Sequence, residues 1–422
     1  MNPILPIEYF IPDVEARQWG DGKIYLYGSS DKCGNMNYCS NVYHVFSSDD
    51  LIHWKAYRNV FTSGSVNDPE RKALPLYAPD CVKINDTYYL FYCQEGGCEG
   101  IAESKVPQGP FTDLGPLLPA DKTGIDPSVF VDDDGKVYYF WGQISLNGGE
   151  LDLENRRLVD STVTRNIITD VKDGFHEGSS IRKRNGIYYL VYSDISRGRP
   201  TCMGYATSLH PLGPYVKRGI IIDNTGCDPQ SWNDHGSIAE INGNWYVFYH
   251  RSTQNSFFSR HVCMEPIHFN PDGTIDEVEM TSQGVEGPLD AFSVIDAYRA
   301  CLLSGKCYVD AGLVQDVCVQ YINGMRAGDT ITFKYLDFSD VPEGVSIRAT
   351  VSDKTEFKLY IDDSKAEAAG IKVSNSPDFQ DCYGKMRFKV TGKHSITLKM
   401  FGGSDTAGKI LDLHFTRQNS AN

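Results

Sequence analysis

Several features are missing from this sequence, and each absence excludes a class of protein. The chain has no run of about eighteen apolar residues, and its N-terminus has no basic segment followed by an apolar one. We therefore expect a cytoplasmic protein with no membrane partner. None of the twelve cysteines forms a C-x-x-C pair, which disfavours a structural zinc site. We expect the thiols to be reduced.

Positive charge is also scarce. The 422 residues include 40 Lys and Arg against 55 Asp and Glu, giving a net charge of −15. This balance disfavours nucleic acid or an anionic membrane surface as a partner and favours a neutral ligand. Aromatic residues make up 12%, including 25 Tyr, which suits β-sheets and stacking on sugar rings. The length favours two domains.

One phrase recurs five times in the first 250 residues or so: a turn with Gly or Asp, followed by a run of aliphatic and aromatic residues. Such runs predict β-strands, and a repeat of roughly fifty residues is typical of a propeller with four-stranded blades. We therefore expect a five-bladed β-propeller. The copies are GKIYLYG, DTYYLFY, GKVYYFW, GIYYLVY and GNWYVFY, starting at Gly22, Asp86, Gly135, Gly186 and Gly243.

A polar or ionisable residue precedes each copy at a similar offset. A single acid before a strand is usually a turn or cap residue, but the recurrence favours a shared role. If each lies on the innermost strand of its blade, all five point to one end of the central axis. A carboxyl group drawn into such a cavity should hold its proton near neutrality, as a general acid must, and Glu177 is the best candidate. The five are Asp13, Asp80, Asp126, Glu177 and His235.

Other candidates have more than one explanation. His235 is either a buried histidine bonded to backbone or part of a ligand or metal shell. Arg260 is either a surface ion-pair residue or a binding residue. Trp19, Tyr77, Trp141 and Trp232 are either packing residues or sugar platforms.

The character of the sequence changes after GVEGPLDAF, near residue 288. Short alternating strands divided by turns follow, with no helical period, and they predict a β-sandwich of the jelly-roll type over residues 289–422. The first domain then covers residues 1–288, and the fold class is all-β. The expected strands are KCYVDAG, DTITFKYLDF, VSIRATVS, FKLYIDD, KMRFKVTG, HSITLKMFG and KILDLHFT.

Converging carboxylates and a neutral ligand suit glycoside hydrolysis, in which two carboxyl groups flank the scissile bond. The first 288 residues or so resemble glycoside hydrolase family 43. The matching segments are IPDVEARQWGDGKIYLYGS, LYAPD, IDPSVFVDDDGKVYYFWG, HEGSSIRKRNGIYYLVYS, NDHGSIAEINGNWYVFYHR and FSRHVCMEPI. Val14 departs from the family's more common Asp-Pro pattern.

This resemblance implies a role for each matched residue. Asp13 would be the general base, Asp126 would orient the acid and tune its pKa, and Glu177 would be the general acid of an inverting reaction. Arg260 would contact sugar hydroxyls. His235 would help to hold a calcium ion in the axial channel through its water shell.

Residues 289–422 resemble a family 6 carbohydrate-binding module more weakly. Ile295, Asp296, Ala297 and Tyr298 stand where such modules have a calcium-binding Glu-Ala-Glu stretch. Tyr383 is the nearest candidate for the usual loop tryptophan. This domain is therefore expected to bind sugar, to play a structural role, or to form part of the border of the active site.

The family resemblance leaves several substrates open. Without an export signal, we expect exo-action on imported arabinose- and xylose-containing oligosaccharides, by an α-L-arabinofuranosidase with β-D-xylosidase activity. The alternatives are mainly β-xylosidase, arabinanase, or a non-catalytic glycan-binding propeller. A retaining β-fructosidase would carry an Asn-Asp-Pro-Asn-Gly start, which is missing here.

Overall fold

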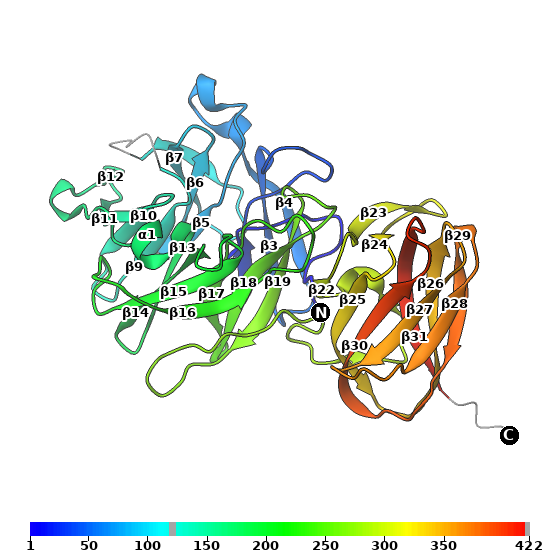
Figure 1. Ribbon diagram of the computed structural model, residues 1–422. Coiled ribbons are helices and arrows are strands. Elements are labelled where there is room, and N and C mark those ends of the chain that lie inside the picture. The colour runs from blue at the N-terminus through cyan, green and yellow to red at the C-terminus, as the bar shows by residue number, and fades with distance from the viewer. Residues whose placement is uncertain (118–123, 418–422) are drawn as a thin grey trace.

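A computed structural model describes residues 1–117 and 124–417 of the chain, and it is built almost entirely of β-strands (Figure 1). The helical segments among the described residues are short: α1 (Asp170–Asp173) and four single-turn 3₁₀ segments, Ser63–Ser65, Pro69–Arg71, Asp160–Thr162 and Ala297–Arg299. None of the described helices is long and apolar enough to cross a membrane. The all-β fold class predicted from the sequence is confirmed.

Five antiparallel sheets follow one another along the first part of the chain, each with its strands in sequence order. They are β1 (Glu15–Gln18), β2 (Ile24–Tyr27), β3 (Val42–Ser48) and β4 (Lys55–Thr62); β5 (Asp80–Ile84), β6 (Thr87–Gln94), β7 (Cys98–Ser104) and β8 (Thr112–Pro116); β9 (Ser128–Val131), β10 (Val137–Trp141), β11 (Asn147–Asp152) and β12 (Arg157–Leu158); β13 (Phe175–Arg184), β14 (Ile187–Asp194), β15 (Cys202–Ser208) and β16 (Val216–Asp223); and β17 (Ser237–Ile241), β18 (Asn244–Ser252) and β19 (Arg260–Ile267).

Each repeated phrase forms the second strand of its sheet, namely β2, β6, β10, β14 and β18. The segment before each phrase forms the first strand. These first strands contact one another in cyclic order: β1 with β5, β5 with β9, β9 with β13, β13 with β17, and β17 with β1. The polar residues that precede the repeats are thereby brought around one axis.

Asp80 differs from the other four residues of the predicted set. Its carboxylate accepts from Arg17 at 2.6 Å and from the backbone N–H of Val129 at 2.7 Å, and it is fully buried. Arg17 and Arg182 also pair with Glu15, so the axis holds a compact cluster of opposite charges. A buried charge is stable only when paired in this way, so Asp80 serves the packing of the axis and does not line the pocket described below.

The N-terminal segment docks against the fifth sheet. The N–H of Ile4 donates to Val262 of β19, and the buried Asn2 side chain exchanges hydrogen bonds with both backbone groups of Met264. A core of aliphatic and aromatic side chains from the first and fifth sheets lies behind this contact. The two ends of the five-sheet unit are thus joined.

Two further sheets follow and share one buried core. The strands are β20 (Leu289–Asp290), β21 (Ile295–Asp296), β22 (Leu302–Leu303), β23 (Tyr308–Val314), β24 (Val317–Met325), β25 (Thr330–Phe338), β26 (Pro342–Val351), β27 (Thr355–Ile361), β28 (Ala369–Val373), β29 (Ser376–Lys385), β30 (Gly392–Phe401) and β31 (Gly408–Arg417). One sheet has the order β20-β25-β30-β27-β28 with β22 beside β25; the other has β23-β24-β31-β26-β29 with β21 beside β31.

The strand predicted for KMRFKVTG is wrong. β29 ends at Lys385, and residues 386–391 lie outside any strand. Arg387 donates its N–H to the carbonyl of Ala368, and Phe388 is 39% exposed. Val390 is buried in the core and Met386 packs against it, so the segment contacts the core as a loop and not as a strand. The prediction also missed β24, β28 and β29.

The two parts of the chain touch through polar contacts on β23 and β24. Gln254 donates its N–H to the carbonyl of Val309, and the Gln320 amide contacts His261 Nε2 at 3.1 Å. Burial lowers the pKa of His261 to about 4, so its ring is neutral: Nδ1 donates to Tyr9 and Nε2 accepts from Gln320. Gln254 lies in the loop between β18 and β19, and His261 follows the pocket residue Arg260 in β19.

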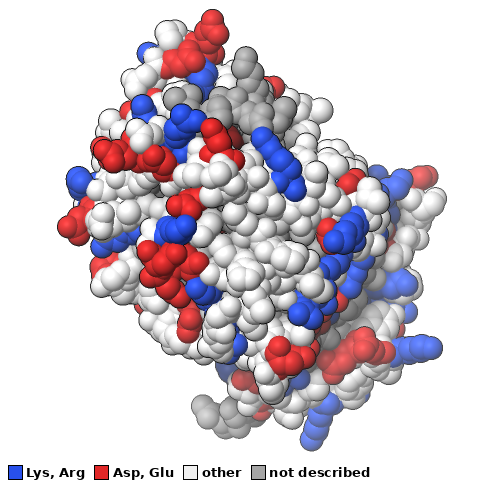
Figure 2. Space-filling view, turned by 90° about the vertical axis from the view of Figure 1, so that its left-hand side faces the viewer, with Lys and Arg blue, Asp and Glu red and all other residues white. Residues whose placement is uncertain are grey.

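On the face shown in Figure 2, acidic and basic side chains are intermixed around a broad uncharged area.

Candidate active site

A pocket of about 180 Å³ lies where loops from all five sheets meet. Carboxylates, amides and aromatic side chains line it. The lining residues are Asp13, Tyr38, Cys39, Tyr77, Ala78, Ile125, Asp126, Gln143, Glu177, Asn233, His235 and Arg260. Four of the five predicted axial residues are therefore brought together here, together with Tyr77 and Arg260.

Asp13 and Asp126 enter the pocket in the same way. Each precedes the first strand of its sheet by two residues, and each has a left-handed backbone, with φ of 57° and 56°. This conformation is unfavourable for residues with a side chain and is found where function requires a fixed direction. The matching geometry gives the two carboxylates equivalent positions on the first and third sheets.

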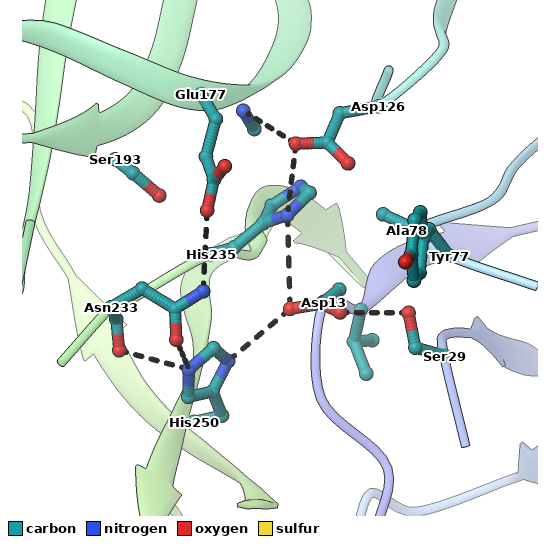
Figure 3. A network of polar contacts seen from close by, with 12 residues as sticks. Asp13, Ser29, Tyr77, Ala78, Asp126, Glu177, Ser193, Asn233, His235 and His250 are labelled. Carbon is teal, nitrogen blue, oxygen red and sulfur yellow. Dashed lines mark hydrogen bonds and ion pairs between the residues drawn. The ribbon is translucent and has the colours of Figure 1, made fainter. Parts of the chain in front are cut away.

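Asp13 is held on both oxygens. Ser29 Oγ donates to Oδ2 at 2.7 Å, and Arg260 Nη1 donates to Oδ1 at 2.9 Å (Figure 3 shows the Ser29 contact). Burial alone would raise the pKa of Asp13, but the Arg260 guanidinium and the neighbouring groups outweigh it, and the pKa lies below its usual value. Asp13 is therefore an ionised carboxylate at neutral pH.

Arg260 is itself fixed by a second carboxylate. Its Nε and Nη2 donate to the two oxygens of Asp31 at 2.8 and 2.9 Å, a bidentate pair, and its guanidinium lies 4.9 Å from the centre of the Tyr38 ring. All three nitrogens are thus engaged by protein groups. The hydrogen bonds of Arg260 hold Asp13 in place, and its expected contact with sugar hydroxyls stays a prediction.

Asp126 and Glu177 lie on the other side of the pocket. Asp126 Oδ2 accepts from the N–H of Gly178, and Glu177 accepts from Gln143 Nε2 at 2.7 Å and from Asn233 Nδ2 at 3.3 Å. Burial, followed by the charges of Glu177 and Asp13, raises the pKa of Asp126 well above its usual range. The site therefore combines an ionised carboxylate, Asp13, with a carboxyl group able to retain a proton, Asp126.

His235 lies between the two aspartates, with Nδ1 at 3.7 Å from Asp13 and 3.9 Å from Asp126 (Figure 3). Its ring covers Gly178, where an added Cβ would fall 2.7 Å from it. Gly178 has φ of +69°, so this position needs glycine both for its backbone and for the space.

His250 lies behind Asp13. Its Nε2 faces the backbone and side-chain oxygens of Asn233, at 2.9 and 3.2 Å, while Nδ1 lies 3.6 Å from Asp13 without a hydrogen bond. Burial and the charge of Arg260 lower the pKa of His250 to about 3, so the ring is neutral and carries its proton on Nε2.

His235 is predicted to help hold a calcium ion through its water shell, and this role stays a prediction. Calcium takes six to eight oxygen ligands as a rule, and among residues 1–117 and 124–417 no group of three His, Cys, Asp or Glu side chains is placed to hold a metal. The neighbours of His235 are carboxylates already engaged by Ser29, Arg260 and Gly178.

Two of the predicted sugar platforms lie elsewhere. Trp19 donates its indole N–H to Tyr27 and packs edge-on against Tyr88, at the far end of β1 from Asp13. Trp141 is 2% exposed and packs beside Tyr139 in the core. Neither lines the pocket, because both aromatic rings are used for packing between strands.

Some pocket residues were missed from the sequence. Tyr38, Gln143 and Asn233 lie in irregular segments without a repeating offset. Asn233, two residues before His235, was the easiest of them to find, since it falls inside the quoted NDHG segment.

Comparison with known proteins agrees with this geometry. The family model for glycosyl hydrolases family 43 matches residues 1–275. A protein of Thermoclostridium stercorarium named xylosidase/arabinosidase is 31% identical over 402 residues, covering 80% of this chain and 82% of the relative. An arabinoxylan arabinofuranohydrolase of Bacillus subtilis is 27% identical over 408 residues, covering 82% of this chain and 78% of the relative.

Solved structures show the same fold. A family 43 arabinoxylan arabinofuranohydrolase from Bacillus subtilis, in complex with cellotetraose, aligns with a TM-score of 0.57 at 22% identity over 99% of this chain and 97% of its own. A β-xylosidase/α-arabinofuranosidase from a compost metagenome, with xylotriose and in a calcium-free form, aligns with a TM-score of 0.58 at 26% identity over 66% of this chain and 97% of its own. The chain belongs to glycoside hydrolase family 43 and is a glycoside hydrolase.

Proposed function

We propose that this enzyme is an inverting, exo-acting hydrolase that releases α-L-arabinofuranose, and also β-D-xylose, from arabinoxylan-derived oligosaccharides. The observation that carries the proposal is the placement of Asp13, Asp126 and Glu177 around one small pocket. The names of the two relatives, xylosidase/arabinosidase and arabinoxylan arabinofuranohydrolase, support the substrate class.

Asp13 is the proposed general base. Its carboxylate is ionised and fixed by Ser29 and Arg260, so it can accept a proton from water without reorienting. That water attacks the anomeric carbon from the face opposite the leaving group, and its proton passes to Asp13.

Glu177 is the proposed general acid. It gives its proton to the glycosidic oxygen as the bond to the anomeric carbon breaks, and it ends the reaction as a carboxylate. Asp126 is its positioning residue: it binds the backbone of Gly178, next to Glu177, and its carboxyl group disfavours a second charge nearby. The amides of Gln143 and Asn233 stabilise the carboxylate that forms.

A pocket of this size suits one terminal pentose, which favours exo-action over cleavage within a chain. The proposal also includes the architecture: a five-bladed β-propeller over residues 1–288, supported by the cyclic contacts of the first strands, and a β-sandwich resembling a family 6 module over residues 289–422. No step of this proposal is routed through calcium.

A paired assay tests the proposal. The enzyme is given an aryl α-L-arabinofuranoside and an aryl β-D-xyloside, and proton NMR follows the anomer first released. Release of inverted sugar supports the mechanism and ranks the two activities. Release with retention contradicts the roles of Asp13 and Glu177. No release from either substrate favours an arabinanase or a non-catalytic glycan-binding propeller.

A further inference from the structure

A row of four aromatic side chains leads out of the pocket. It begins at Tyr38, which lines the pocket, and continues through Phe258, whose ring centre lies 4.7 Å from that of Tyr38. Phe257 follows at 5.8 Å from Phe258, and Trp232 follows at 6.2 Å from Phe257. The row is therefore a continuous apolar surface from the buried centre to the rim.

The outer end of this row is open to solvent. Trp232 is 42% exposed and is the one tryptophan among the exposed large hydrophobic residues, since the other four are packed within or against the cores. An indole exposed on a pocket rim costs hydration free energy unless it meets a ligand. Trp232 precedes Asn233, which lines the catalytic pocket, so a ligand bound there could cover the indole.

Trp232 lies on the side of the proposed acid. The next residue, Asn233, donates to Glu177 Oε1, whereas the proposed base Asp13 is held by Ser29 and Arg260 on the opposite side. The leaving group departs beside the acid that protonates it. The sugar ring on the leaving side of the scissile bond would then emerge near Glu177 and Asn233, the residue that follows Trp232.

The loops carrying the row are fixed in place. Asp228 Oδ2 accepts from the N–H of Asn255 at 3.0 Å, which joins the Trp232 loop to the Phe257 loop. Asn224 Nδ2 donates to the carbonyl of Asn233 at 2.8 Å, beside Trp232. A surface held this way loses little conformational entropy when a ligand stacks on it.

We propose that Trp232, backed by Phe257, is a stacking platform for the leaving-side sugar, and that the ligand is a neutral oligosaccharide of pentose units. The inference rests on the proposed function. Sugar rings present apolar C–H faces that stack on aromatic rings, and the outer members of the row, Phe257 and Trp232, are aromatic. Trp232 thereby determines the preference for oligosaccharides over short substrates.

The test uses the full-length chain carrying Glu177→Gln, so that bound sugar is not cleaved. Calorimetry measures the affinity for xylotetraose and for the monosaccharides xylose and arabinose. We expect Trp232→Ala to weaken xylotetraose binding about tenfold and Trp232→Phe to restore most of it. Monosaccharide binding should be unchanged, because one sugar fills the pocket without reaching the rim.

A matched control is Phe388→Ala, which removes an aromatic side chain of similar exposure (39%) from the C-terminal part; xylotetraose binding should not change. Unchanged binding in Trp232→Ala would overturn the inference, as would an equal loss for monosaccharides, which would mean that the pocket itself had been disturbed. If the Glu177→Gln protein binds none of the three sugars, the proposed function fails, and this inference fails with it.

Discussion

Arg260 and Asp13 form a buried ion pair in which Nη1 lies 2.9 Å from Oδ1, and the arginine is 1% exposed. The remaining nitrogens of Arg260 bind Asp31, so the guanidinium is clamped between two carboxylates. The charge of Arg260 is what keeps Asp13 ionised despite its burial.

Removing this charge should change the pH dependence of the reaction. In Arg260→Gln, the pKa of Asp13 rises, so a higher pH is needed to ionise the base, and the acidic limb of the kcat/KM profile moves to higher pH. Arg260→Lys keeps the charge and should keep the limb nearer to that of the wild type. The measurement is the pH profile of both variants, with circular dichroism as the check on folding; an unmoved limb in Arg260→Gln would show that Asp13 is not the titrating base.

Removing either proposed catalytic carboxylate should abolish most of the activity. We expect Asp13→Asn and Glu177→Gln each to lower kcat by about 10²–10⁴-fold while the fold survives. A substrate with a good aryl leaving group needs little protonation, so it should rescue Glu177→Gln but not Asp13→Asn. Asp134→Asn, in an exposed hairpin turn, is the control and should behave as the wild type. Equal rescue of both variants would contradict the assignment of acid and base.

Gly178→Ala should damage the site from the backbone side. The added methyl would meet the ring of His235 at 2.7 Å, at a φ of +69° that disfavours any side chain. We expect a loss of about 1–3 kcal/mol in unfolding free energy and a larger relative loss of kcat, because Glu177 and the N–H bound by Asp126 move with the residue. Denaturant unfolding and kinetics measure the two effects. A stable and fully active variant would rule out a close His235–Gly178 contact.

The contact between the two parts of the chain is testable at Gln320. Its side chain is 4% exposed and donates to the neutral ring of His261, so Gln320→Ala leaves Nε2 without a donor. An unsatisfied buried acceptor costs about 1–3 kcal/mol, and thermal unfolding should occur at a correspondingly lower temperature. Gln315→Ala, in the exposed turn between β23 and β24, is the matched control. An unchanged Tm in Gln320→Ala would mean that the contact does not stabilise the docking of β24.

Glu265 should make stability depend on pH. Burial raises its pKa from 4.5 to about 7, although Arg251 and the Thr281 groups oppose the shift. Because the folded pKa lies above the unfolded one, its contribution to stability is present in full below about pH 4.5 and is lost as pH rises toward 7. We expect the difference in Tm between wild type and Glu265→Gln to shift in favour of the variant as pH rises through this window. Exposed Glu240→Gln should give no such trend. A Tm difference between wild type and Glu265→Gln that does not change with pH would show that Glu265 does not titrate in this window.

Pocket residues that belong to the sequence repeat are easier to predict than those that do not. Asp13, Asp126, Glu177 and His235 share an offset before a strand, and the cyclic contacts of the first strands bring them together. Asp80 precedes its repeat by six residues, against eight or nine for the other four, and it pairs with Arg17 of β1. Sequence spacing alone does not show whether an acid pairs with a buried arginine or lines the pocket.

Residues without a repeat were harder to predict. Tyr38 and Gln143 reach the pocket from irregular segments whose path depends on tertiary contacts. Trp19 and Trp141 look like sugar platforms in the sequence, yet an aromatic ring at a strand end serves packing equally well. In the C-terminal part, KMRFKVTG alternates like a strand, but its Arg387 bonds to Ala368 outside the ladder.

The joining of the two ends of the five-sheet unit has a consequence for the order of events during synthesis. Asp13 leaves the ribosome early, whereas Arg260, 247 residues later, is made only when the fifth sheet is nearly complete. Until then the base has no guanidinium to hold its charge, and residues 2–4 have no β19 to dock on. Contacts so distant in sequence close slowly. Hydrolytic activity in a translation reaction should therefore appear only after the fifth sheet has left the ribosome, which makes catalysis a reporter of the contact between the first and fifth sheets.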